Sequence, residues 1–106
     1  MAVTDVTDAT FADVVLSSST PVVVDYWADW CAPCRQLSPI LDELAVELGD
    51  KVTFVKMDTN VNTQVPVSQG VMSLPTVQIF VGGQVAKQFV GAKPKSAFLK
   101  ALEEYL

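Results

Sequence analysis

The chain contains no histidine. The side chain that most often acts as a general base near neutral pH, and most often binds zinc, is therefore absent. Any acid–base chemistry must use a carboxylate, a lysine or a thiol. The chain also lacks the run of roughly 20 apolar residues that a membrane span needs, and no basic and then apolar leader follows Met1. We therefore expect a cytoplasmic protein with no membrane partner.

Charged residues are few, and those of one sign do not cluster. Lys and Arg number 7 against 12 Asp and Glu, which gives a formal net charge of −5. Because no run of Lys or Arg is present, nucleic acid is not an expected partner. A chain of 106 residues is long enough for one hydrophobic core but too short for two. We expect a single domain over residues 1–106 that acts as a monomer.

The only two cysteines are Cys31 and Cys34, with Ala32 and Pro33 between them. In a reducing compartment such a close pair is more often catalytic or metal-binding than a structural staple. Zinc needs four nitrogen or sulfur ligands, so a metal site would need a second chain, and we expect no metal. An inert disulfide and half of a zinc site are the alternatives to redox chemistry.

Hydrophobic patterning predicts an α/β fold with the element order β-α-β-α-β-α-β-β-α. The expected strands are 3–6, 21–28, 52–58, 76–81 and 84–90, and the expected helices begin near 8, 34, 60 or 62, and 94. The first helix should place Phe11, Val14 and Val15 on one apolar face. Crossover helices between the first four strands predict a largely parallel inner sheet with helices on both faces. The hairpin at Gly82-Gly83 should add an antiparallel edge.

The cysteine pair lies between the predicted central strand and the start of the next helix. If Cys31 is the half-helical first residue, its freer backbone lets the two sulfurs meet, whereas a pair in mid-helix would close badly. A thiolate at a helix N-terminus faces unpaired N–H donors and the positive end of the helix dipole. We therefore expect Cys31 to be the exposed, attacking sulfur and Cys34 to be the buried, resolving sulfur.

Asp25 is a lone carboxylate in the apolar central strand. Burial should raise its pKa, so that it exchanges protons near neutral pH, and with no histidine present it is the best candidate for a base. A hydrogen-bonded structural Asp is the alternative. Trp27 is expected to serve mainly in packing, whereas Trp30 is the better surface candidate.

Several segments together resemble the thioredoxin family. They are VVVDYWADWCAPCRQLSPILDELA, VKMDTN, GVMSLPT, VGGQV and FVGA, and they follow one another over essentially the whole chain. The resemblance implies a thioredoxin fold, with a central mixed sheet of about five strands and four flanking helices. It also implies a general protein disulfide reductase with Cys31 as nucleophile and Cys34 as resolving thiol. No cofactor is implied, because the reversible Cys31–Cys34 disulfide is itself the redox centre.

The same resemblance implies roles for further residues. Asp25 matches the family Asp that assists deprotonation of the resolving thiol, and Lys56 matches the lysine that neighbours it. The residues that would border the apolar substrate groove are Trp30, Pro33, Leu74, Pro75, Gly91 and Ala92. The Leu74–Pro75 bond is expected to be cis. The implied partners are disulfide-containing proteins and a separate thioredoxin reductase, which would restore the dithiol.

Three positions depart from the family pattern. Ala32 stands where the commonest motif has Gly, and the dipeptide between the cysteines tunes the reduction potential, so the potential stays open. Met72 occupies a loop position that is often basic or polar, and Ser73 one that is often Gly, which predicts an altered preference for partners. Two other functions also stay open: a thiol oxidase or isomerase of the same fold, and a redox-inert adaptor that uses the same groove.

Overall fold

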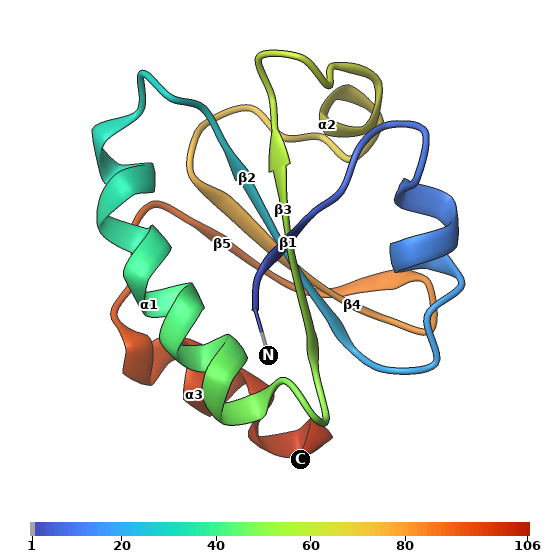
Figure 1. Ribbon diagram of the computed structural model, residues 1–106, viewed down its shortest axis with the longest axis vertical. Coiled ribbons are helices and arrows are strands. Elements are labelled where there is room, and N and C mark those ends of the chain that lie inside the picture. The colour runs from blue at the N-terminus through green and yellow to red at the C-terminus, as the bar shows by residue number, and fades with distance from the viewer. Residues whose placement is uncertain (1) are drawn as a thin grey trace.

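The middle of the protein is a five-stranded sheet with strand order β1-β3-β2-β4-β5 (Figure 1). The structure is a computed structural model that describes residues 2–106. The strands are β1 (Thr4–Asp5), β2 (Val22–Trp27), β3 (Thr53–Asp58), β4 (Thr76–Val81) and β5 (Gln84–Val90). The helices are the π-helix η1 (Ala12–Leu16), α1 (Ala32–Leu48), α2 (Gln64–Ser68), α3 (Lys95–Leu102) and the 3₁₀ helix η2 (Glu103–Tyr105). The predicted element order is confirmed.

The side chains of β2 alternate between the two faces of the sheet, and both faces are covered. Val22, Val24 and Tyr26 belong to the core cluster to which η1 and α2 contribute. Val23 belongs to the cluster that includes residues of α1 and α3. Figure 1 shows α1 and α3 together, away from η1 and α2. Because side chains alternate along a strand, Asp25 faces the α1 side of the sheet.

The connection from β3 to β4 differs from the prediction. A crossover helix should have made these strands parallel, but β4 is antiparallel to β2, which is itself parallel to β3. Helix α2 has only 5 residues, about 8 Å of helix, whereas a return along a strand of 6 residues needs about 20 Å. The expectation of a largely parallel inner sheet is therefore wrong. Helix α2 keeps the chain at the end of the sheet where β3 finishes, and β4 starts from that end.

The first helix buries a different face from the one expected. Phe11 and Val15 are buried, but Val14 is 37% exposed. The N–H of Ser17 donates to the carbonyl of Ala12, five residues back, at 3.0 Å, which is the hydrogen-bond spacing of a π-helix. The wider turn directs Val14 away from the core, so the expectation that it shares the buried face is wrong.

The N-terminus of α2 is capped by a residue from far earlier in the chain. Asp8 Oδ2 accepts hydrogen bonds from the N–H groups of Thr63 and Gln64, both at 3.1 Å, and Oδ1 accepts from Val65 at 2.9 Å. An α-helix leaves its first N–H groups without an internal partner. Asn62 instead accepts a bond from the Asp8 N–H at 2.9 Å. The helix that was expected to begin near 60 or 62 thus begins at Gln64 and is capped from a distant part of the chain.

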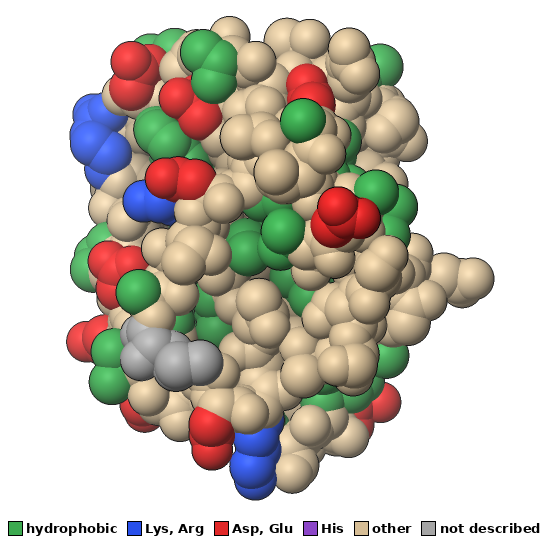
Figure 2. Space-filling view, turned by 45° about the vertical axis from the view of Figure 1, so that its right-hand side comes forward, with side chains coloured by type: hydrophobic (Ala, Val, Ile, Leu, Met, Phe, Trp, Pro, Cys, Tyr) green, Lys and Arg blue, Asp and Glu red, His purple; other side chains and the backbone are tan. Residues whose placement is uncertain are grey.

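Charged side chains are spread over the surface. On the face shown in Figure 2, Asp and Glu side chains are scattered, and Lys and Arg side chains occupy small, separate areas. This face therefore offers no continuous basic surface. Within residues 2–106, no helix combines the length and the apolar character that crossing a bilayer requires.

Replacing the cap tests its contribution to stability. We expect Asp8→Ala to lower the free energy of unfolding by about 2 kcal/mol, because the N–H groups of the N-cap residue Thr63 and of the first two residues of α2 lose their acceptor. Urea denaturation measures this change. The matched control is Asp5→Ala, since Asp5 is an exposed residue of β1, and a change below about 0.5 kcal/mol is expected there. An equal loss in both variants would contradict the capping role.

Candidate active site

The two cysteines form a disulfide at the N-terminal end of α1. Cys31 is the N-cap residue, with φ −95° and ψ 103°, and Cys34 lies in the first turn. Their Cα atoms are 5.3 Å apart. Pro33 occupies an early helical position, where a backbone N–H is not needed. The expectation that Cys31 is the half-helical residue is confirmed.

The backbone around Cys31 is suited to a negatively charged sulfur. The N–H of Cys34 donates to Cys31 Sγ at 3.2 Å. In the reduced protein a Cys31 thiolate would accept the same bond and would face the positive end of α1, and both interactions stabilise a thiolate.

Within residues 2–106, no group of three or more His, Cys, Asp or Glu side chains is placed to hold a metal ion.

Asp25 is buried, and one of its carboxylate oxygens has no partner. The residue is 4% exposed, and Oδ1 makes no hydrogen bond to any described residue. Removal from water raises the pKa of Asp25 from 3.8 to about 7, and the positive charge of Lys56 partly opposes this rise. Lys56 is the residue of β3 that lies in register with Asp25. Near pH 7 the carboxyl group therefore gains and loses a proton readily.

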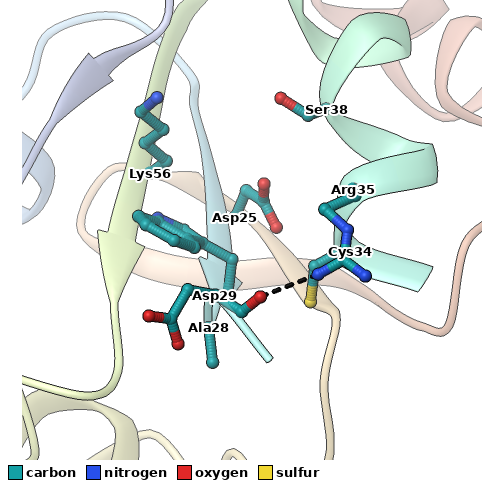
Figure 3. Close-up of a pocket in the computed structure, with 8 residues that line it drawn as sticks. Asp25, Ala28, Asp29, Cys34, Arg35, Ser38 and Lys56 are labelled. Carbon is teal, nitrogen blue, oxygen red and sulfur yellow. Dashed lines mark hydrogen bonds between the residues drawn. The ribbon is translucent and has the colours of Figure 1, made fainter. Parts of the chain in front are cut away.

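A pocket of about 260 Å³ opens beside Asp25, between β2, β3 and α1 (Figure 3). It is lined by Asp25, Trp27, Ala28, Asp29, Cys34, Arg35, Ser38 and Lys56. In Figure 3 the Asp25 carboxylate lies between Lys56 and Cys34. Liquid water takes about 30 Å³ per molecule, so the pocket has room for several waters. Asp25 and Cys34 thus line the same pocket.

The two cysteines differ in what they face rather than in exposure. Cys31 and Cys34 are each 4% exposed, in a cluster with Ala28 against which Trp27 and Leu74 pack. The expectation of an exposed Cys31 above a buried Cys34 is therefore wrong for the disulfide form, because neighbouring side chains cover both residues. Cys34 lines the pocket that contains Asp25, and Cys31 does not.

Residues expected around a substrate groove come together at the disulfide end of the sheet. The Leu74–Pro75 peptide bond is cis, as expected. The N–H of Gly91 donates to the carbonyl of Pro75 at 2.8 Å. Leu74 is half-buried against the disulfide cluster, whereas Ala92 and Pro33 are exposed. Segments far apart in the sequence therefore border the same region.

Trp30 is a surface residue held in place by a neighbouring loop. Its side chain is 70% exposed, and Nε1 donates to Asn60 Oδ1 at 3.1 Å. Asn60 Nδ2 donates in turn to Asp29 Oδ1 at 3.0 Å. The Arg35 guanidinium donates to the backbone carbonyl of Asp29 at 2.7 Å, the bond drawn in Figure 3. These bonds fix the indole of Trp30 in an exposed position.

The residues of this region that sequence reasoning missed include Asp29, Arg35, Ser38 and Asn60. Ser38 follows Cys34 by four positions on α1, and that spacing places both side chains on one helix face, so the signal was present. Nothing in the sequence indicates that Asn60 contacts Trp30. The contact depends on the parallel pairing of β2 with β3, which brings the ends of both strands together.

The raised pKa of Asp25 predicts how stability depends on pH. Between about pH 4 and pH 7 the native carboxyl group holds a proton that the unfolded chain has released, so the free energy of unfolding falls as pH rises through this range. Asp25→Asn should remove this fall. At pH 8 the variant should be more stable than the parent by up to about 4 kcal/mol, at about 1.36 kcal/mol per pKa unit, and the difference should vanish near pH 4. Urea denaturation at several pH values measures both curves.

Lys56→Met provides the second arm of this test. Because Lys56 lowers the pKa of Asp25 in the native protein, removing its charge should extend the fall in stability to higher pH, while the pH at which the fall begins stays the same. Parallel curves for the parent and Asp25→Asn would show that Asp25 does not titrate in this range, contrary to the prediction.

Comparison with known proteins identifies the family. The family model for thioredoxin matches residues 2–104. The chain is 46% identical over 105 residues to thioredoxin 1 of Nostoc sp., covering 99% of this chain and 98% of that protein. It is 45% identical over 101 residues to the chloroplastic M-type thioredoxin of Chlamydomonas reinhardtii, covering 95% and 72%. It is also 45% identical over 100 residues to a bifunctional thioredoxin reductase/thioredoxin of Mycobacterium leprae, covering 94% and 22%. The chain belongs to the thioredoxin family.

Proposed function

We propose that Cys31 attacks disulfide bonds in other proteins and that Cys34 resolves the mixed disulfide, with Asp25 as proton acceptor. The chain is a protein-disulfide oxidoreductase of the thioredoxin family, and its redox centre is the Cys31–Cys34 pair. One observation supports this division of labour above others: Cys34, and not Cys31, lines the pocket that contains the Asp25 carboxylate. The relatives do not favour the oxidase, isomerase or adaptor alternatives.

The exchange proceeds in two steps. The Cys31 thiolate attacks one sulfur of the substrate disulfide, forming a mixed disulfide and releasing the other substrate sulfur as a thiolate. Cys34 then gives its proton to Asp25 and attacks the Cys31 sulfur, which releases the second substrate thiolate and closes the Cys31–Cys34 bridge. Two electrons pass from the dithiol to the substrate.

Asp25 and Lys56 together determine how much ionised carboxylate is available to act as a base. A base must be ionised to accept a proton, and a carboxyl group with a pKa of about 7 is ionised in roughly half of the molecules at neutral pH. We propose that Lys56 keeps the pKa from rising further, so that ionised Asp25 remains available to Cys34. Lys56 thus acts on Cys34 through Asp25.

The substrate is proposed to bind over the disulfide, where it meets apolar surface and a free stretch of backbone. The residues assigned to this groove are Trp30, Pro33, Leu74, Pro75, Gly91 and Ala92. Among the described residues, the backbone N–H and C=O of Leu74 take part in no hydrogen bond. They are free to pair with an extended substrate segment, as in strand addition to a sheet edge. Backbone pairing does not depend on side-chain identity, which favours a broad range of proteins.

Ala32 and Pro33 lie exposed between the two cysteines. We propose that these residues tune the reduction potential, since they stand in the turn that opens and closes with the disulfide. A shift of about 30 mV corresponds to about 1.4 kcal/mol for this two-electron couple.

The proposed partners are disulfide-containing proteins and a thioredoxin reductase that restores the dithiol. One relative is named as a bifunctional reductase/thioredoxin, and this chain matches only 22% of it. Residues 1–106 carry no nucleotide-binding glycine signature, which supports the proposal of a separate reductase. We further propose that residues 1–106 form one domain, that this domain acts as a monomer and that its site of action is the cytoplasm, where reducing conditions keep the dithiol available.

Serine variants of the two cysteines test the order of attack. In an insulin-reduction assay driven by dithiothreitol, Cys31→Ser should abolish catalysed turnover because no nucleophile remains. Cys34→Ser, reduced beforehand and then freed of dithiothreitol, should still attack insulin and should then accumulate as a mixed disulfide with it, since no other thiol is present to resolve the bond. Mass spectrometry under non-reducing conditions detects that adduct. Full turnover by Cys31→Ser, or an adduct formed by Cys31→Ser instead of Cys34→Ser, would overturn the assignment.

Trp30→Ala tests the groove. Losing an aromatic contact of about 1 kcal/mol should raise KM for a protein disulfide about threefold to tenfold, with little effect on reduction of a small aromatic disulfide. The matched control is Val46→Ala on α1, because Val46 is also 70% exposed. Steady-state kinetics with both substrates separates the two variants. Equal effects of the two substitutions on KM would contradict a substrate groove that includes Trp30.

A further inference from the structure

Met72 is the most exposed large hydrophobic side chain in residues 2–106. It is 95% exposed, whereas Met57 of β3 is 0% exposed. Met1 lies outside the described residues. The described part of the chain therefore presents one fully accessible methionine and one that is fully covered. Because oxidation follows exposure, an oxidant should distinguish the two.

The loop that carries Met72 is held on both sides. Before it, the N–H of Val71 donates to the carbonyl of Pro66 at 2.9 Å. After it, the Thr76 hydroxyl donates to the carbonyl of Ser73 at 2.6 Å. An anchored backbone thus presents the thioether of Met72 to solvent.

Met72 is close in sequence to a residue that contacts the disulfide cluster. Leu74, two residues further on, packs against the cluster of Cys31 and Cys34. Trp30 adds a second exposed apolar side chain beside the cysteines. A protein substrate that pairs with the Leu74 backbone must approach this loop. That substrates bind there rests on the proposed function. The flexible, polarisable side chain of Met72 suits contact with many different partners.

We propose that Met72 is a site of oxidation by hydroperoxides and that its sulfoxide weakens the binding of protein substrates. The Met72 sulfur attacks a peroxide oxygen, the S–O bond forms as the O–O bond breaks, and the departing oxygen takes up a proton. With hydrogen peroxide the products are the sulfoxide and water; sulfur loses two electrons and the peroxide gains them. The sulfoxide is polar, so the apolar contact with the substrate is lost.

The disulfide form allows this reaction to be studied separately from oxidation of the cysteines. Peroxides react with a thiolate, and neither Cys31 nor Cys34 carries one while the bridge is closed. The protein can therefore be treated with peroxide as the disulfide, freed of peroxide and then reduced. Any change in activity then arises outside the cysteine pair.

The test measures oxidation and activity on the same sample. After treatment of the disulfide form with hydrogen peroxide, peptide mass mapping should show Met72 oxidised at least about tenfold faster than Met57. The treated protein should reduce insulin about threefold to tenfold more slowly and should reduce a small aromatic disulfide at the untreated rate. Comparable oxidation of Met57 and Met72, or an unchanged insulin rate once Met72 is fully converted, overturns the proposal.

Met72→Leu is the control for oxidation elsewhere, including at Met1 and Trp30. Leu keeps an apolar side chain but has no sulfur to oxidise. Treatment with peroxide should therefore leave the rate at which this variant reduces insulin unchanged from its own untreated rate. A loss equal to that of the parent overturns the assignment to Met72. Failure of the untreated parent to reduce either substrate would instead count against the proposed function, which separates the two proposals.

Discussion

The site depends on the burial of one carboxyl group in a strand that is covered on both faces. β2 lies between β3 and β4 and is packed against α1 on the side that Asp25 faces. Asp25 is therefore only 4% exposed, and its carboxylate oxygen Oδ1 finds no hydrogen-bond donor among the described residues. A buried carboxyl group without donors is stable chiefly in its protonated form. The Lys56 charge opposes this tendency, and the balance sets the pKa near neutrality.

Strand register explains why the rest of the site assembles over this carboxyl group. β4 runs antiparallel to β2 with Tyr26 opposite Thr76, so the start of β4 lies beside the end of β2, and Pro75 comes with it. β5 runs antiparallel to β4 with Val90 opposite Thr76, which brings Gly91 to the same end. The disulfide follows directly after β2, and one edge of the sheet therefore gathers three distant segments. The prediction error in strand direction matters here, because a parallel β4 would start at the opposite end of the sheet from the disulfide.

Local signals in the sequence predicted what depends on local structure. The strand-to-helix junction indicated Cys31 as N-cap, and an isolated acid in an apolar strand indicated the raised pKa of Asp25. Contacts that depend on tertiary pairing could not be predicted in this way. Asp8 caps α2 across 55 positions, and Asn60 holds Trp30 across 30 positions, and neither pair shows a spacing that a helix or strand would impose. The packing of Leu74 against the disulfide cluster likewise depends on where β4 begins.

The energetic consequence of Asp25 favours a role in chemistry over a role in structure. Moving its pKa from 3.8 to about 7 disfavours the ionised native protein by about 4 kcal/mol, against a total stability of about 5–15 kcal/mol for a typical domain. A neutral or apolar side chain of similar size would avoid this loss, and the strand around Asp25 is otherwise apolar. No hydrogen bond to a described residue offsets the loss at Oδ1. The proposed mechanism uses a base with a pKa near 7 beside Cys34, and the buried Asp25 carboxyl group next to Lys56 has the pKa and the position that this role requires. In the proposed mechanism, Asp25 thus does the work that a histidine often does in other active sites.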